Sequence, residues 1–226
     1  MVDKDSAIAE IDLIRWSEAL AGIARTGLGF TESLYERERY EEILAVAAEI
    51  AAAAGRRYQP DALVQEWLEQ VGEGVAGYVT PKVAVGAVVG NDKGEILLIK
   101  RSDSGIWLYP TGWADIGYSP SEVAVKEVRE ETGIEVEVQR LIGVFDGLRL
   151  GFTRTPLYSL VFLCRAIGGE LLAHPLECDD VGWFAPDALP EPLASSNHWG
   201  AHALAAIRGE DVGVLYDEPR PEVWKG

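Results

Sequence analysis

The chain has 226 residues, of which 48% are hydrophobic, and it carries a formal net charge of −17. This size and composition allow a sizeable core, arranged as one large domain or two small ones. The charge argues against a general nucleic-acid surface and against binding to anionic membranes, because phosphate groups would be repelled.

No targeting or membrane-spanning segment is predicted. The first five residues are acidic and polar, and no apolar run is long enough to span a bilayer. Two cysteines, Cys164 in an apolar strand-like run and Cys178 in an acidic loop, form no disulfide framework, and Cys164 is expected in the core. We therefore expect a cytoplasmic protein.

Three helices are predicted in a small all-α domain at residues 1–76. Apolar residues of the first recur at alternating steps of three and four, and residues 27–31 break this pattern. The predicted segments are Ser6–Thr26, Glu36–Ala54 and a helix that starts at Pro60. Since no catalytic cluster occurs here, we expect these helices to pack, to dimerise or to cover a site, with packing favoured.

A second domain is predicted at residues 80–226, after a linker at Gly74–Pro81 that contains two glycines and a proline. Its first two strands are expected at Lys82–Val89 and Glu95–Arg101, joined by a turn at residues 91–94. Arg101 ends the second strand. It is either a phosphate contact or an ordinary solvated strand end.

The stretch from Gly112 to Ile134 encodes a glycine-bearing turn, a short helix and a second glycine turn. Ser119 is the expected N-cap, and it forms a capping box with Glu122. Pro120 suits the first helical position and Gly133 the left-handed residue after the last. The helix should therefore span Pro120–Thr132.

Three carboxylates share one edge of this helix. Glu127, Glu130 and Glu131 stand at positions i, i+3 and i+4, where like charges repel one another close to the negative end of the helix dipole. They form either a solvated charged face, with Lys126 and Arg129 as partners, or the ligands of a hard divalent cation such as Mg²⁺ or Mn²⁺.

The run Lys126–Ile134, KEVREETGI, resembles the second half of the Nudix hydrolase signature, and Gly112 falls where that signature begins. The resemblance implies an α/β/α sandwich with a mixed sheet and a Mg²⁺-dependent pyrophosphatase, in which Mn²⁺ can substitute. It also implies roles for four residues. Glu127 and Glu131 would be the principal metal ligands, Glu130 would assist in binding and catalysis, and the Thr111 carbonyl would complete the shell.

Two positions depart from the signature. Tyr118 stands in place of its first glutamate, and Lys126 in place of its arginine. In the family these two side chains commonly pair and brace the loop and helix. The double replacement puts that brace in doubt but leaves the three glutamates untouched.

The N-terminal region is similar to the helical extension of one branch of the family. The similarity rests on residues 24–28, Tyr35 and residues 39–42. That branch includes CDP-choline pyrophosphatases and ADP-ribose pyrophosphatase-like proteins, and the extension favours a homodimer. Tyr35 and Tyr40 either stack on a nucleobase or belong to the core, and we favour the core.

Two strands are expected after the signature, at Glu135–Phe145 and Pro156–Ile167. Between them Arg149 and Arg154 form a basic loop, which either grips the phosphates or second moiety of the substrate or is simply solvated. The polar loop 168–180 follows. By resemblance, the general base comes from this loop, with Glu177 as first choice and Asp180 as second.

A short strand at Val181–Phe184, a one-turn helix at Pro186–Leu189 and a helix at Asn197–Ile207 complete the predicted elements. Two histidines, His198 and His202, lie four residues apart on the last helix, a spacing that can hold zinc but that we interpret as surface histidines. The tail Asp211–Gly226 is either mobile or held by Trp224.

The expected reaction is hydrolysis of the pyrophosphate of a nucleoside diphosphate linked to a moiety X, which gives a nucleoside monophosphate and a phosphorylated X. ADP-ribose and CDP-choline are close competitors. The proline of many ADP-ribose hydrolases is absent near Arg149, and the signature loop, GWADIG followed by a non-acidic residue and SPSE, most resembles the CDP-choline branch. An alternative is a catalytically inactive Nudix-like module that senses a nucleotide, with Tyr118 and Lys126 as signs of decay.

Overall fold

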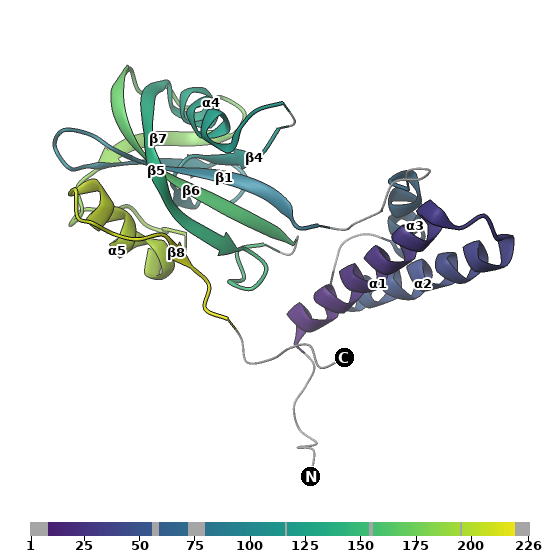
Figure 1. The fold of residues 1–226 in the computed structure, drawn as a ribbon. Helices are drawn as coiled ribbons and strands as arrows, with labels where there is room; N and C mark the ends of the chain where they lie inside the picture. Colours follow the sequence, from purple (N-terminus) through teal and green to yellow (C-terminus); the bar gives the residue numbers. More distant parts are fainter. Residues whose placement is uncertain are drawn as a thin grey trace, which may run out of the picture. The chain divides into compact units, whose positions relative to one another are not determined.

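The computed structural model describes residues 9–55, 59–71, 80–115, 117–153, 156–194 and 196–219, without the side chains of residues 196–198. Most of the predicted linker, Arg154, the side chain of His198 and Trp224 lie outside these residues. The chain divides into two compact units, one with helices α1 to α3 and the other with the sheet, α4 and α5 (Figure 1).

The first unit consists of α1 (Glu10–Phe30), α2 (Leu34–Ala53) and α3 (Pro60–Glu69). Its core combines a few large side chains with many alanines, which let the helices approach closely: Ala21, Ala24, Leu28, Leu44, Ala47, Ala48, Ala51, Leu63 and Trp67. The Ser33 hydroxyl caps α2 by accepting the Glu36 N–H. The buried Ser17 hydroxyl donates to the Ala47 carbonyl at 2.7 Å, so the contact between α1 and α2 leaves this polar group satisfied.

The predicted break at residues 27–31 is wrong, because α1 continues to Phe30. Gly27 is instead a packing position, since a Cβ there would lie 2.1 Å from the Tyr40 ring. Tyr40 packs against the helical core and is confirmed as a core aromatic. Tyr35 is 68% exposed, so the prediction that it belongs to the core is wrong.

In the residues that the structure describes, the second unit is built on one mixed sheet of eight strands. The order is β3-β2-β1-β6-β5-β8, with β4 beside β1 and β7 beside β2. The β1–β6 and β5–β8 pairs are parallel, and the other described pairs are antiparallel. The strands are β1 (Lys82–Gly90), β2 (Ile96–Arg101), β3 (Trp107–Leu108), β4 (Thr111–Trp113), β5 (Ile134–Asp146), β6 (Leu157–Gly169), β7 (Cys178–Phe184) and β8 (Leu215–Tyr216).

Helices α4 (Pro120–Thr132) and α5 (Ser196–Ile207) cover opposite faces of this sheet (Figure 1). Side chains alternate along β1, so Val85, Ala87 and Val89 join the core under α4, while Val88 joins the core under α5. The predicted α/β/α sandwich with a mixed sheet, preceded by helices, is thereby confirmed.

Several local predictions after the signature are wrong. Cys178 is buried in β7 rather than lying in a loop, and Asp180 belongs to the same strand, opposite Lys100. Residues 186–189 form a turn and not a helix, with one bond from the Ala188 N–H to the Ala185 carbonyl. Cys164 is buried in the core, as predicted.

The described part of the C-terminal segment is tied to the sheet. Residues of β8 pair with β5, the Asp217 carboxylate accepts the Asp146 N–H at 2.7 Å, and the Arg140 guanidinium donates to the Val212 carbonyl. His202 is partly buried, with Nε2 3.0 Å from the Ile142 carbonyl oxygen, so this histidine packs against β5 and is not a simple surface residue. Among the described residues, no helix has both the length and the apolar character needed to cross a membrane.

Candidate active site

Local sequence signals specify where α4 begins and ends. The Ser119 hydroxyl accepts the Glu122 N–H, the Glu122 carboxylate accepts the Ser119 N–H, and Pro120 is the first helical residue. Gly133 ends the helix in the left-handed region with φ of 72°. A Cβ on Gly133 would lie 2.4 Å from the Glu170 carbonyl oxygen, so this position accepts glycine alone. The predicted helix Pro120–Thr132 and its caps are confirmed.

The three glutamates of α4 occupy two different environments. Glu127 and Glu131, one turn apart, are buried, with 9% and 3% of their surface exposed. The Glu130 side chain is 53% exposed. The three carboxylates that the sequence places on one edge of the helix therefore differ in environment. Glu127 and Glu131 form a buried pair, and Glu130 faces solvent.

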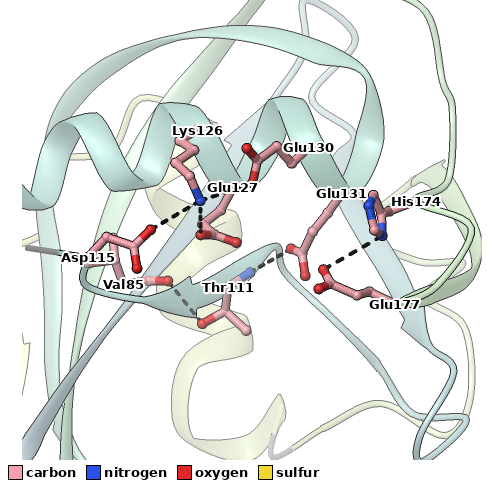
Figure 2. Close-up of polar contacts among 9 residues, drawn as sticks. All are labelled: Val85, Thr111, Asp115, Lys126, Glu127, Glu130, Glu131, His174 and Glu177. Carbon is pink, nitrogen blue, oxygen red and sulfur yellow. Dashed lines mark hydrogen bonds and ion pairs between the residues drawn. The ribbon is translucent and has the colours of Figure 1, made fainter. Parts of the chain in front are cut away.

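The buried pair is held by strand β4. The Thr111 N–H donates to Oε2 of Glu131 at 2.9 Å, while the Thr111 hydroxyl donates to the Val85 carbonyl (Figure 2). The Glu127 carboxylate lies against Gly112, where an added Cβ would come within 2.2 Å of the carboxyl carbon. A side chain at residue 112 would therefore displace the Glu127 carboxylate.

Burial has a large effect on the ionisation of this pair. It raises the pKa of Glu131 to about 8, with the charges of Glu127 and Glu177 adding to the shift and the Thr111 N–H opposing it. Burial also raises the pKa of Glu127, and the neighbouring Lys126 ammonium opposes that shift. Two anionic carboxylates at this place therefore need a cation to offset their desolvation and mutual repulsion.

Lys126 replaces the arginine of the signature, and three carboxylates surround its ammonium. Its Nζ lies 3.0 Å from Glu130, 3.3 Å from Glu127 and 3.4 Å from Asp115 (Figure 2). These contacts raise the pKa of Lys126 well above its ordinary value, with the bond to Glu130 as the largest cause. Tyr118, by contrast, is 53% exposed.

Sequence reasoning missed Asp115. The signal available in the sequence was an acidic residue three positions before Tyr118, the residue that replaces the first glutamate of the signature.

Glu177 lies beside Glu131 (Figure 2), and its charge contributes to raising the pKa values of Glu127 and Glu131. Its segment is attached to the end of α4, because the Leu172 and His174 N–H groups donate to the Thr132 and Glu131 carbonyls. His174, also missed from the sequence, has its Nδ1 3.9 Å from the Glu177 carboxylate (Figure 2).

Asp180, the second candidate for the base, is placed differently. It lies within β7, and its carboxylate accepts the N–H of Val181.

Of the predicted cationic contacts, Arg101 lies near the carboxylates. The charge of Arg101 lowers the pKa of Glu131, and its guanidinium forms two hydrogen bonds with Asp103, at 3.0 and 2.7 Å. Arg149 lies in the turn after β5, where its backbone N–H donates to the Asp146 carboxylate at 3.0 Å. Arg154 lies outside the described residues.

The side chains of this site fit a hard divalent cation. They offer carboxylate and backbone oxygens, the ligands that Mg²⁺ and Mn²⁺ prefer, on a rigid helix and beside a strand. Among the described residues, no group of three or more histidine, cysteine, aspartate or glutamate side chains lies close enough together to hold a metal ion. The buried Glu127 and Glu131 are the residues that could hold the ion, and the shell would need further oxygen ligands.

Comparisons with known proteins agree with this geometry. Residues 80–205 match the family model described as NUDIX domain, and residues 12–61 match the model described as UDP-X-like, N-terminal oligomerisation domain. YjhB of Bacillus subtilis strain 168, provisionally named an ADP-ribose pyrophosphatase, is 32% identical over 180 residues, which are 79% of this chain and 82% of that protein.

Two solved structures are similar. An ADP-ribose pyrophosphatase of Streptococcus suis is 34% identical with a TM-score of 0.54, over 61% of this chain and 100% of that one. A UDP-X diphosphatase is 29% identical with a TM-score of 0.54, over 93% of this chain and 100% of that one. With its signature helix, its sandwich fold and these matches, the chain belongs to the Nudix hydrolase family.

Proposed function

We propose that this pyrophosphatase hydrolyses a nucleoside diphosphate linked to a moiety X in a reaction that requires Mg²⁺, for which Mn²⁺ can substitute. The observation that carries the proposal is the burial of Glu127 and Glu131 side by side on α4. Buried carboxylates that repel each other lower the stability of a fold, so they are best explained by a cation that they bind in function.

In the proposed site, Glu127 and Glu131 are the main metal ligands, and Glu130 and the Thr111 carbonyl complete the shell. The bound ion would neutralise charge on the pyrophosphate and lower the pKa of the attacking water. The protein contributes rigidity. The Thr111 N–H orients the Glu131 carboxylate, and the contact with Gly112 restricts that of Glu127.

We assign Glu177 as the general base. Its carboxylate accepts a proton from water, the water oxygen forms a bond to one phosphorus, and the bond from that phosphorus to the bridging oxygen breaks. The nucleoside monophosphate and phospho-X then separate. Glu177 suits this role better than Asp180, because the carboxylate of Asp180 already accepts a backbone N–H within β7.

For the substrate we propose a group of three candidates rather than one compound. The names of the relatives point to ADP-ribose and to UDP-linked compounds, and the resemblance of the signature loop points to CDP-choline. Arg101 would contact the phosphates once Asp103 releases it, while Arg149 and Arg154 are proposed to reach the part of the substrate remote from the metal.

The decisive test is release of monophosphate from ADP-ribose, UDP-sugars, CDP-choline and NADH, with Mg²⁺ and with EDTA. We expect turnover of at least one compound in Mg²⁺ and none in EDTA. Tight binding of one compound without turnover of any would instead support the catalytically inactive nucleotide sensor.

The base is tested by Glu177→Gln, with Asp180→Asn as the matched control on the neighbouring strand. Loss of a general base costs about 100-fold to 10,000-fold in kcat. We expect a loss of this size for Glu177→Gln and a rate within about threefold of the parent for Asp180→Asn, given that general-base losses start near 100-fold. The reverse pattern would assign the base to Asp180.

We further propose a homodimer that forms through α1 to α3. Support comes from the match of residues 12–61 and from large apolar side chains that this unit exposes: Trp16, Ile23, Phe30, Leu34, Tyr35 and Val46. Light scattering after gel filtration should give twice the chain mass. A monomer at micromolar concentration would contradict this part of the proposal.

A further inference from the structure

The Lys126 ammonium interacts with the same carboxylates that the proposed function needs for a cation. Its distances to Glu130 and Glu127 are 3.0 and 3.3 Å, and its side chain is only 29% exposed. A lysine ammonium and a divalent ion compete for the same oxygen lone pairs, and the positive charge of the lysine also opposes approach of the ion. Without a further partner, Lys126 would therefore weaken the binding of the ion that the glutamates are proposed to hold.

Asp115 supplies that partner from outside the helix. Among the described residues it is the one ion-pair partner of Lys126 that does not belong to α4, at 3.4 Å from Nζ (Figure 2). It stands two residues after the end of β4, and the Ala114 N–H beside it donates to the Val83 carbonyl at 2.9 Å. The Asp115 carboxylate is therefore held on a backbone anchored to the sheet, on the opposite side of the ammonium from Glu130 in Figure 2.

We propose that Asp115 is a positioning residue, which shares the Lys126 ammonium with Glu127 and Glu130, offsets its positive charge and so keeps these carboxylates available to the divalent ion. The inference rests on the proposed metal-binding role of the glutamates. Asp115 itself binds neither the ion nor the substrate. It acts through Lys126, so its effect must disappear when Lys126 has no charge.

This dependence separates the inference from a simple loss of negative charge near the site. Asp115→Asn removes the charge and keeps the size of the side chain, and Lys126→Met removes the ammonium and keeps most of the stem. The matched control is Glu137→Gln, which also deletes one exposed carboxylate of an ion pair, at 2.8 Å from Arg165 between β5 and β6. All side chains concerned are at least partly exposed, so the variants should fold, and circular dichroism melting curves check this.

The measurement is Mn²⁺ binding, followed by the electron paramagnetic resonance signal of the free ion, for the four variants including the double variant. We expect Asp115→Asn to weaken Mn²⁺ binding about fivefold, the effect of one partly exposed ion pair. In the Lys126→Met background the same substitution should change binding by less than about twofold, well under the effect of such a pair. Glu137→Gln should leave Mn²⁺ binding unchanged.

If Asp115→Asn weakened Mn²⁺ binding equally in the parent and in the Lys126→Met background, the inference would be overturned, since Asp115 would then act through its own charge. Unchanged binding in Asp115→Asn would overturn it as well. In both cases the parent protein still binds Mn²⁺, and the proposed function stands. If the parent binds no Mn²⁺ at millimolar concentration, the proposed function fails together with this inference.

Discussion

Helices α2 and α4 are both capped at their N-termini by serine, yet they bury different kinds of side chain. The face that α2 buries is apolar, with Leu44, Ala47, Ala48 and Ala51. Helix α4 buries Val123, Ala124 and Val128 together with two carboxylates. Burial in α2 contributes to stability, whereas burial of the two carboxylates in α4 lowers stability and is proposed to prepare a metal site.

The strongest test of this difference is Glu131→Gln. Removing one proposed ligand of a charge-neutralising ion should lower kcat by at least about 100-fold. The fold should remain intact, because the amide keeps the shape of the carboxylate and still accepts the Thr111 N–H. Steady-state kinetics and circular dichroism measure the two effects. A rate near that of the parent would show that Glu131 is no ligand.

Gly112→Ala should produce a smaller loss of the same kind. The new Cβ would lie within 2.2 Å of the Glu127 carboxyl group, so the carboxylate must move while Glu131 stays in place. Misplacement of one ligand predicts a fall in kcat of about 10-fold to 100-fold. Gly94→Ala is the matched control in a remote turn with nothing within 4 Å, where only the backbone strain of a positive φ is expected.

In the helical unit, Gly27 is the counterpart of Gly112. We expect Gly27→Ala to change the stability of the protein without changing catalysis. Alanine normally stabilises a helix relative to glycine by about 1 kcal/mol. At Gly27 the Cβ would clash with the Tyr40 ring, so we expect a loss of about 1–3 kcal/mol.

Urea unfolding measures this loss. Tyr40→Ala in the same chain should relieve the clash, and the double variant should then be more stable than the sum of the two single effects. Additive effects would contradict a direct clash between the two side chains.

The last expected effect is a pH dependence of stability in protein kept free of divalent ions by EDTA. Burial raises the pKa of Glu131 from its ordinary value of 4.5 to about 8 in the folded state. A raised carboxyl pKa favours the fold while the group is protonated, so its contribution is complete below about pH 4.5 and is lost as the pH rises through 8.

The melting temperature of the parent should therefore fall relative to that of Glu131→Gln between pH 5 and pH 8.5. Mg²⁺ should reverse the fall at the high end of this range. Parallel curves for the two proteins would show that Glu131 ionises normally.

Elements with local signals were predicted well. The cap at Ser119, the proline at 120 and the left-handed glycine at 133 specify the bounds of α4, because each acts within one turn of the chain. The long strands β1, β5 and β6 were found for a similar reason, since their apolar runs are long. The strands β4 and β8, of three and two residues, carry too little pattern, and pairing with β1 and β5 defines them.

Partners that are distant in the sequence were not predictable in this way. The role of Gly27 depends on a tyrosine of the next helix, which turns an apparent helix break into a packing contact. His174 approaches the site because its segment binds the free carbonyls at the end of α4.

The sequence by itself determined the family, the bounds of the signature helix and the identity of its three glutamates, because residue type and spacing along one helix are local properties. The tertiary structure decided how these glutamates differ. Packing against β4 buries Glu127 and Glu131 and leaves Glu130 in solvent, and the loop after β4 brings Asp115 to Lys126. Burial and ion pairing depend on what the sheet places beside the helix, and no spacing within the helix encodes that.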